Sequence, residues 1–375
     1  MDKPFVFGVA ASGENFTDRK KETQRLLLNF THGINTILIS PRRWGKTSLV
    51  KKVATLADTG NRRVVYLDIF SCRTEQDFYK MFATAILKQT SSRLDEWIEN
   101  TKLFLTRISP KITMGTDPIN DFSISFELNP KDDSETDILK LPEKIAKEKG
   151  LQIVVCIDEF QQISEFEDSK TFQKKLRTAW QHLENVSFCL FGSKKHLMNA
   201  LFEKKNLPFY KFGDVIYLST IETKDWISYI RERFNVTGKH ISEELAQKVC
   251  TTVDNHSSYV QQLAWLLWIH TDKTATDSEF NAALEDLLNQ NSILFQRETE
   301  NLSAYQINFL KALANGVSSG FSSQHILQQY RLGSSANVTR LKAALLQKEL
   351  IEIENGNISV SDPVFKLWFK KEIPV

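Results

Sequence analysis

The chain has 375 residues, of which 41% are hydrophobic and 25% are charged, and its formal net charge is +2. This length exceeds one ordinary hydrophobic core and predicts two or three domains. The nearly neutral charge excludes nucleic-acid binding through overall charge, and no apolar run approaches the roughly 18 residues that a transmembrane helix needs, so we expect no membrane partner.

Short apolar runs alternate with helical patterns in the first 220 residues. Because these runs are mostly continuous, they are typical of strands that are covered on both faces. The predicted strands are 34–40, 62–70, 151–160, 186–193 and 214–220. The predicted helices between them are 47–57, 76–89, 140–149 and 171–184. The alternation predicts an α/β fold with a parallel five-stranded core and right-handed crossovers.

A long segment separates the second predicted strand from the third. Residues 122–128 alternate strictly between apolar and polar types, and residues 108–114 do so more weakly. The pattern predicts an inserted β-hairpin at about residues 104–130. Two interpretations of this insert stay open: a decoration packed on its own domain, or an edge that binds a partner.

From about residue 221 the pattern becomes helical. Helices are predicted at 223–234, 241–253, 257–271 and 277–290, which indicates a small helical bundle over 221–298. Three further helical patterns are followed by a hairpin that turns at Asn355-Gly356. Three helices and a β-wing are the layout of a winged helix-turn-helix domain, predicted over 299–375. Residues 1–220 form the first predicted domain.

The turn after the first predicted strand carries the pattern of a phosphate-binding loop. Walker A loops read G-x-x-x-x-G-K-[ST], and residues 40–47 read SPRRWGKT. In such a loop, backbone N–H groups and the following helix N-terminus attract phosphate. We expect Lys46 to reach the β- and γ-phosphates and Thr47 to ligate Mg²⁺. The expected nucleotide contacts here are Pro41, Arg42, Arg43, Trp44, Gly45, Lys46, Thr47 and Ser48.

One position departs from the Walker A pattern, because Ser40 replaces the first glycine. A positive φ at this serine would be strained. The alternative interpretation of the whole stretch is an ordinary turn between a strand and a helix, with unrelated basic residues.

The third apolar strand ends in Asp158-Glu159, the Walker B pattern. We expect Asp158 to hold the Mg²⁺ shell and Glu159 to polarise the attacking water and accept its proton. The alternative is a strand end with solvated acids. The fourth strand ends near Ser193, which is a candidate sensor of the γ-phosphate and a candidate N-cap of the next helix, and one serine could fill both roles.

Four stretches together resemble the archaeal-type ATPases of the AAA+/STAND group, which also occur in bacteria. They are PRRWGKTSL (41–49), VVCIDEFQQI (154–163), FCLFGSKKHLM (188–198) and NHSSYVQQLAWLLW (255–268). The resemblance implies an ATPase core, a helical lid and a C-terminal winged helix, with the nucleotide between core and lid.

Two further residues enter the expected site through this resemblance. Phe16, Arg19 and Glu22 are similar to the family's F-x-x-R-x-x-E motif, which implies that Arg19 lies near the adenine. The lid stretch implies that Tyr259 contacts the nucleotide. It lacks the family's usual proline, and Lys211 stands where an arginine often follows tyrosine. A lysine offers only a point charge to the transition state, so we expect slow hydrolysis.

The predicted recognition helix has a modest positive face. Arg340, Lys342 and Lys348 are expected to be exposed, but Glu352 and Glu354 lie close by in the sequence. A positive face would contact DNA phosphates. Winged helices also bind proteins, so the sequence leaves a DNA partner and a protein partner open.

The leading hypothesis is a P-loop ATPase that hydrolyses ATP with Mg²⁺ as a molecular switch, coupling nucleotide state to the winged helix. The alternatives are a DNA-binding AAA+-type protein that resembles origin-recognition ATPases, and a nucleotide-bound protein-interaction scaffold with little turnover. Four scattered cysteines without a C-x-x-C pair, and an N-terminus without a secretory pattern, predict a cytoplasmic protein. The sequence leaves the oligomeric state open.

Overall fold

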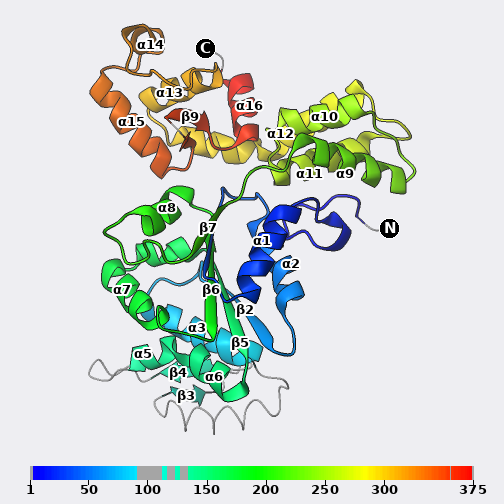
Figure 1. The fold of residues 1–375 in the computed structure, drawn as a ribbon. Coiled ribbons are helices and arrows are strands. Elements are labelled where there is room, and N and C mark those ends of the chain that lie inside the picture. The colour runs from blue at the N-terminus through cyan, green and yellow to red at the C-terminus, as the bar shows by residue number, and fades with distance from the viewer. Residues whose placement is uncertain (1–2, 91–111, 116–122, 127–133, 355, 374–375) are drawn as a thin grey trace. The chain divides into compact units, whose positions relative to one another are not determined.

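The computed structural model describes residues 3–90, 112–115, 123–126, 134–354 and 356–373. They divide into two compact units, which are shown as ribbons in Figure 1. One unit is Arg19–Ser219, and the other combines Met1–Asp18 with Thr220–Val375.

The Arg19–Ser219 unit is built on a five-stranded parallel sheet, which confirms the predicted fold class. Its strand order is β2-β5-β6-β1-β7. The strands are β1 (Thr36–Ile39), β2 (Arg62–Asp68), β5 (Gln152–Asp158), β6 (Val186–Gly192) and β7 (Asp214–Tyr217). Every residue of β1 and β6 is buried, as their continuous apolar sequences require.

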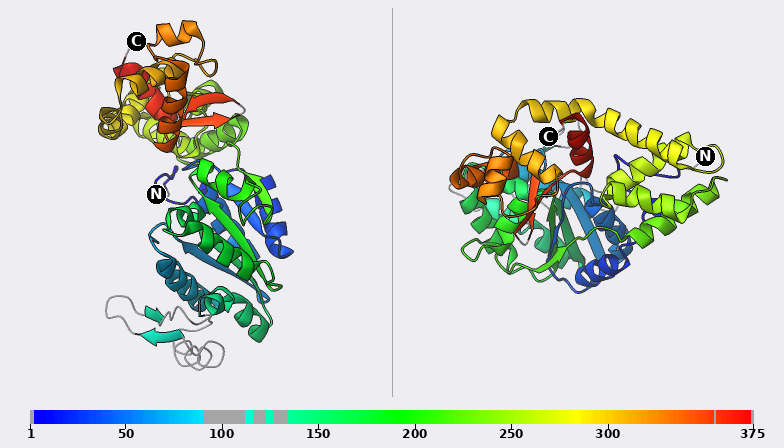
Figure 2. Two further views of the ribbon diagram at one scale, coloured as in Figure 1. Left: turned by 90° about the vertical axis from the view of Figure 1, so that its left-hand side faces the viewer. Right: turned by 90° about the horizontal axis from the view of Figure 1, so that it is seen from above.

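Helices cover both faces of this sheet (Figures 1 and 2). They are α1 (Lys20–Thr31), α2 (Lys46–Ala57), α3 (Glu75–Thr90), α5 (Ser134–Leu139), α6 (Leu141–Lys149), α7 (Ser169–Trp180) and α8 (Lys195–Glu203), with the 3₁₀ helix η2 (Phe160–Glu165) after β5. Because neighbouring strand residues point to opposite faces, Ile37 and Ile39 join the core under α3 and α7. This core is rich in aromatic rings, such as Trp180 stacked on Phe188 with ring centroids 4.0 Å apart.

Two strands lie within the predicted insert. β3 (Ile112–Gly115) and β4 (Ser123–Phe126) pair in antiparallel register. The rest of the predicted hairpin, at about 104–130, lies outside the described residues.

The second unit begins with an N-terminal arm that packs on helices far along the chain. Phe5 is buried against Tyr229 and Phe234, and Val6 N donates to Gln261 Oε1. The arm includes the 3₁₀ helix η1 (Gly13–Asn15), and the helices are α9 (Thr223–Val236), α10 (Glu243–Thr252), α11 (Ser257–His270) and α12 (Asp277–Glu300). Residues 3–18 therefore pack with this helical bundle and not with the predicted first domain, 1–220.

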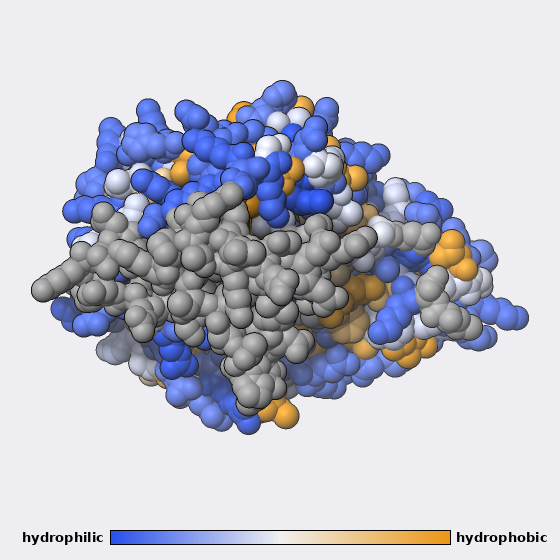
Figure 3. All heavy atoms as spheres, turned by 90° about the horizontal axis from the view of Figure 1, so that it is seen from below, coloured by the Kyte–Doolittle hydropathy of each residue, from blue (hydrophilic) through white to orange (hydrophobic). Residues whose placement is uncertain are grey.

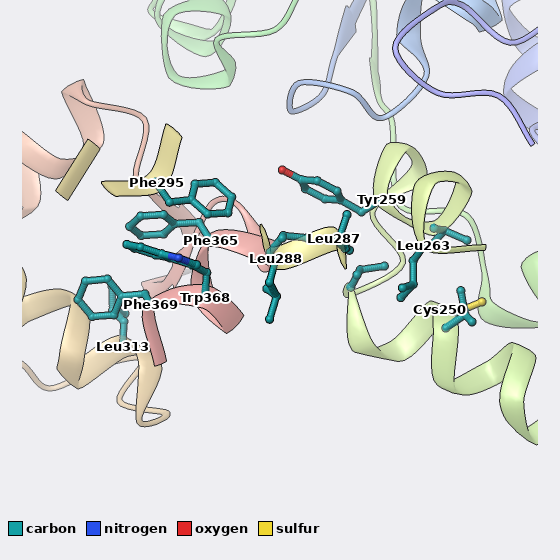
Figure 4. Close-up of a cluster of buried hydrophobic side chains, with 14 of the residues drawn as sticks. Cys250, Tyr259, Leu263, Leu287, Leu288, Phe295, Leu313, Phe365, Trp368 and Phe369 are labelled. Atoms are coloured by element: carbon teal, nitrogen blue, oxygen red, sulfur yellow. The ribbon is translucent and has the colours of Figure 1, made fainter. Parts of the chain in front are cut away.

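The winged-helix elements follow in the predicted order. They are α13 (Ala304–Ala314), α14 (Gln324–Gln329), α15 (Ser335–Gln347), β8 (Ile351–Glu354), β9 (Asn357–Val360) and α16 (Pro363–Glu372). The predicted division at residue 298 falls inside α12, which carries Leu287 and Phe295 into one continuous hydrophobic cluster. Figure 4 shows Phe295 beside Phe365, Trp368 and Phe369 of the last helix. That packing explains why α16 is rich in apolar residues.

The described surface seen from below is mostly hydrophilic and carries only small hydrophobic areas (Figure 3). Within the described ranges, no helix combines the length and the apolar character that crossing a bilayer requires.

Candidate nucleotide-binding site

The loop between β1 and α2 has its unusual backbone conformations away from Ser40. Arg43 has a φ of 60° and Gly45 a φ of 90°, whereas Ser40 is not among the described residues with positive φ. The serine is therefore accepted without left-handed strain. Gly45 is the N-cap residue of α2. Because glycine has no side chain, it cannot accept a hydrogen bond from the backbone N–H groups in the first turn of the helix.

Lys46 is buried in this loop, with only 5% of its surface exposed. Its Nζ donates to Ser40 O at 3.0 Å and to Pro41 O at 2.8 Å. Burial lowers the pKa of Lys46 to about 8, although the nearby carboxylates of Glu159 and Asp158 act to raise it. A buried cation beside a helix N-terminus is a strong attractor for phosphate charge.

The start of α2 is bonded to the end of β5. Thr47 Oγ1 donates a hydrogen bond to Asp158 Oδ2 at 2.9 Å. Asp158 Oδ2 also accepts a hydrogen bond of 2.6 Å from the hydroxyl of Tyr66. Burial raises the pKa of Asp158, although both hydroxyl bonds act to lower it. Burial also raises the pKa of Tyr66, so its hydroxyl keeps the proton that it donates.

The carboxylate of Glu159 has two side-chain donors. Its Oε2 accepts a bond from Ser193 Oγ at 2.9 Å and another from Gln161 Nε2. Arg42 Nε donates to the same serine oxygen at 3.4 Å, which connects the loop with the acidic pair. Strand register explains the meeting: Ile39 pairs with Gly192, so Ser40 and Ser193 leave the sheet side by side.

Arg19 ties the beginning of α1 to the loop. It is 3% exposed, and its Nη1 donates to Ser219 O at 2.5 Å while its Nη2 donates to Trp44 O at 3.1 Å. Its guanidinium also lies 3.3 Å from Glu22 Oε1. The arginine therefore holds the backbone of the loop.

Comparisons with known proteins address the fold and the family. Residues 16–263 match a family described as "ATPase domain predominantly from Archaea". The chain belongs to this ATPase family. Residues 293–371 of the ATPase match a second family, described as "Probable winged helix domain". A search of curated proteins found no match.

Two solved structures extend the likeness over nearly the whole ATPase. A Walker-type ATPase of Pyrococcus abyssi shares 16% identity and a TM-score of 0.69, with 98% of this chain and 99% of that one covered. The ORC2 protein of Aeropyrum pernix, solved as ADPNP–ADP complexes, shares 13% identity and a TM-score of 0.59, with 100% and 99% covered. At these identities the likeness shows the fold, and the expected resemblance is confirmed: the protein is a P-loop ATPase with a C-terminal winged helix.

The residues gathered in the ATPase unit fit a nucleotide with Mg²⁺. Thr47 Oγ1 and the Asp158 carboxylate offer adjacent oxygen atoms, which are the ligands that Mg²⁺ prefers. The Lys46 ammonium and the α2 N-terminus supply the positive charge that polyphosphate needs. The donor set and its spacing are therefore compatible with the expected group.

Tyr259 has a different environment from the other predicted site residues. It belongs to α11 of the second unit, is 2% exposed, and donates its hydroxyl to Asp362 Oδ2 at 2.5 Å. Figure 4 shows its ring within the hydrophobic cluster of that unit. Its contact with a nucleotide stays a prediction. Lys211 is exposed, has a φ of 54°, and lies over the ring of Tyr210.

Sequence reasoning missed two residues that hold the acidic pair, Tyr66 and Gln161. Tyr66 lies two residues before Asp68, the last residue of β2. Because side chains two residues apart in a strand point to the same face of the sheet, Tyr66 and Asp68 share a face. Gln161 follows Glu159 by two residues inside η2. Their polar character, close to the predicted strand that ends in Asp158-Glu159, was the available signal.

Proposed function

We propose that this ATPase binds ATP with Mg²⁺ and hydrolyses it slowly. The observation that carries the proposal is the hydrogen bond between Thr47 and Asp158. It joins the loop after β1 to the carboxylate at the end of β5, although the two residues are 111 positions apart in the sequence. In this proposal Lys46 binds the β- and γ-phosphates, and Thr47 and Asp158 hold the metal, which neutralises charge on the phosphates.

Glu159 is the proposed general base. The water oxygen bonds to the γ-phosphorus and passes a proton to the Glu159 carboxylate, while the bond from phosphorus to the bridging oxygen breaks and its electron pair leaves with ADP. Ser193 supports this role because its hydroxyl donates to the same carboxylate. Pro41, Arg42, Arg43, Trp44, Gly45 and Ser48 are proposed to surround the phosphates, with Arg19 near the adenine.

Steady-state phosphate release tests the proposal. We expect release that requires ATP and Mg²⁺ and stops with EDTA. Lys46→Ala should lose nucleotide affinity, whereas Glu159→Gln should keep affinity and lose release. A Glu159→Gln protein that releases phosphate as fast as the unmodified protein would remove Glu159 from the mechanism.

We further propose that nucleotide state controls the winged-helix module predicted over residues 299–375. The family match over 293–371 supports the presence of a winged-helix domain on which such a switch could act. Four buried cysteines without disulfides support a cytoplasmic location. Small-angle scattering with ADP and with a non-hydrolysable ATP analogue tests the switch, and identical curves would contradict it.

DNA binding is the second candidate, favoured by the exposed Arg331, Arg340 and Lys348 around α15. The wing opposes it, since β8 carries Glu352 and Glu354. Anisotropy titrations of duplex DNA at several salt concentrations test this candidate, because phosphate contacts require affinity that falls as salt rises. A third candidate, a nucleotide-bound scaffold, requires tight retention of nucleotide without phosphate release.

A further inference from the structure

The side chain of Gln161 is buried beside the Glu159 carboxylate. It is 2% exposed, and its Nε2 donates to Glu159 Oε2. The opposite amide orientation would place two acceptor oxygens against each other, so the nitrogen is the group that faces the carboxylate. Glu159 has a φ of 55°, which turns the chain sharply from β5 into η2 and brings Gln161 back over the strand ends.

Gly192 leaves the space that this glutamine occupies. A Cβ on Gly192 would lie 1.7 Å from Gln161 Oε1 and 2.9 Å from its Cδ. The φ of Gly192 is outside the positive range, so the backbone conformation does not itself require glycine. The absence of a side chain at Gly192 therefore leaves room for the Gln161 amide.

We propose that Gln161 is a positioning residue for Glu159, and that Gly192 permits this by making room for it. The inference rests on the proposed hydrolysis. Gln161 and Ser193 both donate to Oε2. In the described part of the chain, the side-chain hydrogen bonds to this carboxylate all end on that oxygen. The other oxygen, Oε1, is left to accept the proton of the attacking water.

Gln161→Met tests the role because methionine fills a similar volume without an amide donor. We expect kcat to fall about tenfold while KM and the ATP dissociation constant stay within about twofold, because only the general base is misplaced. Gln162→Met is the matched control. Gln162 is the next residue of the same η2, and its amide donates to Glu165, away from the acidic pair. It should keep the activity of the unmodified protein.

A double-mutant cycle tests the role of Gly192. Gly192→Ala should lower kcat to a similar degree, since its Cβ displaces the Gln161 amide. In a Gln161→Ala background the overlap with the amide is gone and Met198 Sδ, at 3.1 Å from the Cβ, is the tight contact that remains, so the added Gly192→Ala should cause a much smaller further loss than it does alone. A Gly192→Ala loss that is equally large in both backgrounds overturns the steric argument. Unchanged kcat in Gln161→Met, or kcat and affinity falling together, overturns the positioning role.

A second measurement remains informative if the protein releases no phosphate. Chemical denaturation of the nucleotide-free protein compares Gln161→Met, Glu159→Ala and the double variant. A direct bond makes the loss in the double variant smaller than the sum of the single losses, and additive losses overturn the contact. Absent phosphate release with non-additive losses would reject the proposed hydrolysis alone.

Discussion

Replacing Tyr66 by phenylalanine isolates the hydroxyl that donates to Asp158. The acceptor residue is 5% exposed, and the bond is 2.6 Å long. A hydrogen bond to a charged group contributes about 1.5–3 kcal/mol to stability. For a unit of this size, each kcal/mol corresponds to roughly 2–4 °C in Tm, so Tyr66→Phe should lower the Tm of the Arg19–Ser219 unit by about 3–12 °C.

Tyr217→Phe provides the matched control. Tyr217 also donates its hydroxyl to a carboxylate, that of Glu203, but it is 48% exposed. A solvated bond of this kind contributes little, so we expect a change within about 0.5 kcal/mol. Scanning calorimetry of nucleotide-free protein in EDTA compares the two variants. Equal Tm shifts would refute the argument that burial makes the Tyr66 bond important.

Three further predictions test other contacts. Arg19→Lys should weaken ATP binding about tenfold, because lysine cannot bridge Ser219 O and Trp44 O, whereas the same change at the exposed Arg25 should have little effect; isothermal titration measures both. Glu143→Gln should cost about 1–3 kcal/mol at pH 7, since Glu143 accepts two bonds of 2.9 Å from Asn185. Burial acts to raise the pKa of Glu143, but those bonds hold it below its ordinary value, so the stabilisation is present above the unfolded pKa of about 4.3 and is lost as pH falls through the lower folded pKa. The stabilities of the two proteins should therefore converge as the pH falls through the folded pKa of Glu143, and a constant difference would contradict the ionic role. Asp362→Ala should destabilise the second unit by about 2 kcal/mol, because Asp362 caps α16 and accepts a hydrogen bond from the Tyr259 hydroxyl. Hydrogen exchange of α16 peptides should become faster, and unchanged exchange would refute this.

The fold was largely predictable because its signals are local. Continuous apolar runs identified all five strands of the sheet, and the turn pattern at Gly356 identified the wing between β8 and β9. The packing of Phe5 on Tyr229 was not predictable, since nothing near Phe5 in the sequence names a partner more than two hundred residues away. The same limit applies to α12. A domain boundary was expected at residue 298, but α12 continues through that position to Glu300.

The phosphate loop was predictable in part. Its composition indicated an anion site. Because Ser40 replaces the first glycine, a positive φ at this position was expected to strain the backbone. The structure has positive φ at Arg43 and Gly45, and Ser40 is not among the described residues with positive φ, so the serine gives no reason to expect a distorted loop. The sequence pattern records which residue types are usual and does not record which backbone angle each position adopts.

Tyr66 and Gln161 show why the supporting contacts of the site escaped the sequence. Tyr66 pairs in register with Cys156, and Asp68 pairs with Asp158. A slip of one residue between β2 and β5 would turn the tyrosine to the opposite face of the sheet from Asp158. Likewise, Gln161 reaches Glu159 only because Gly192 on the next strand lacks a Cβ. Both contacts depend on register between strands, which local patterns do not determine, so motif residues can be recognised from the sequence while the residues that orient them cannot.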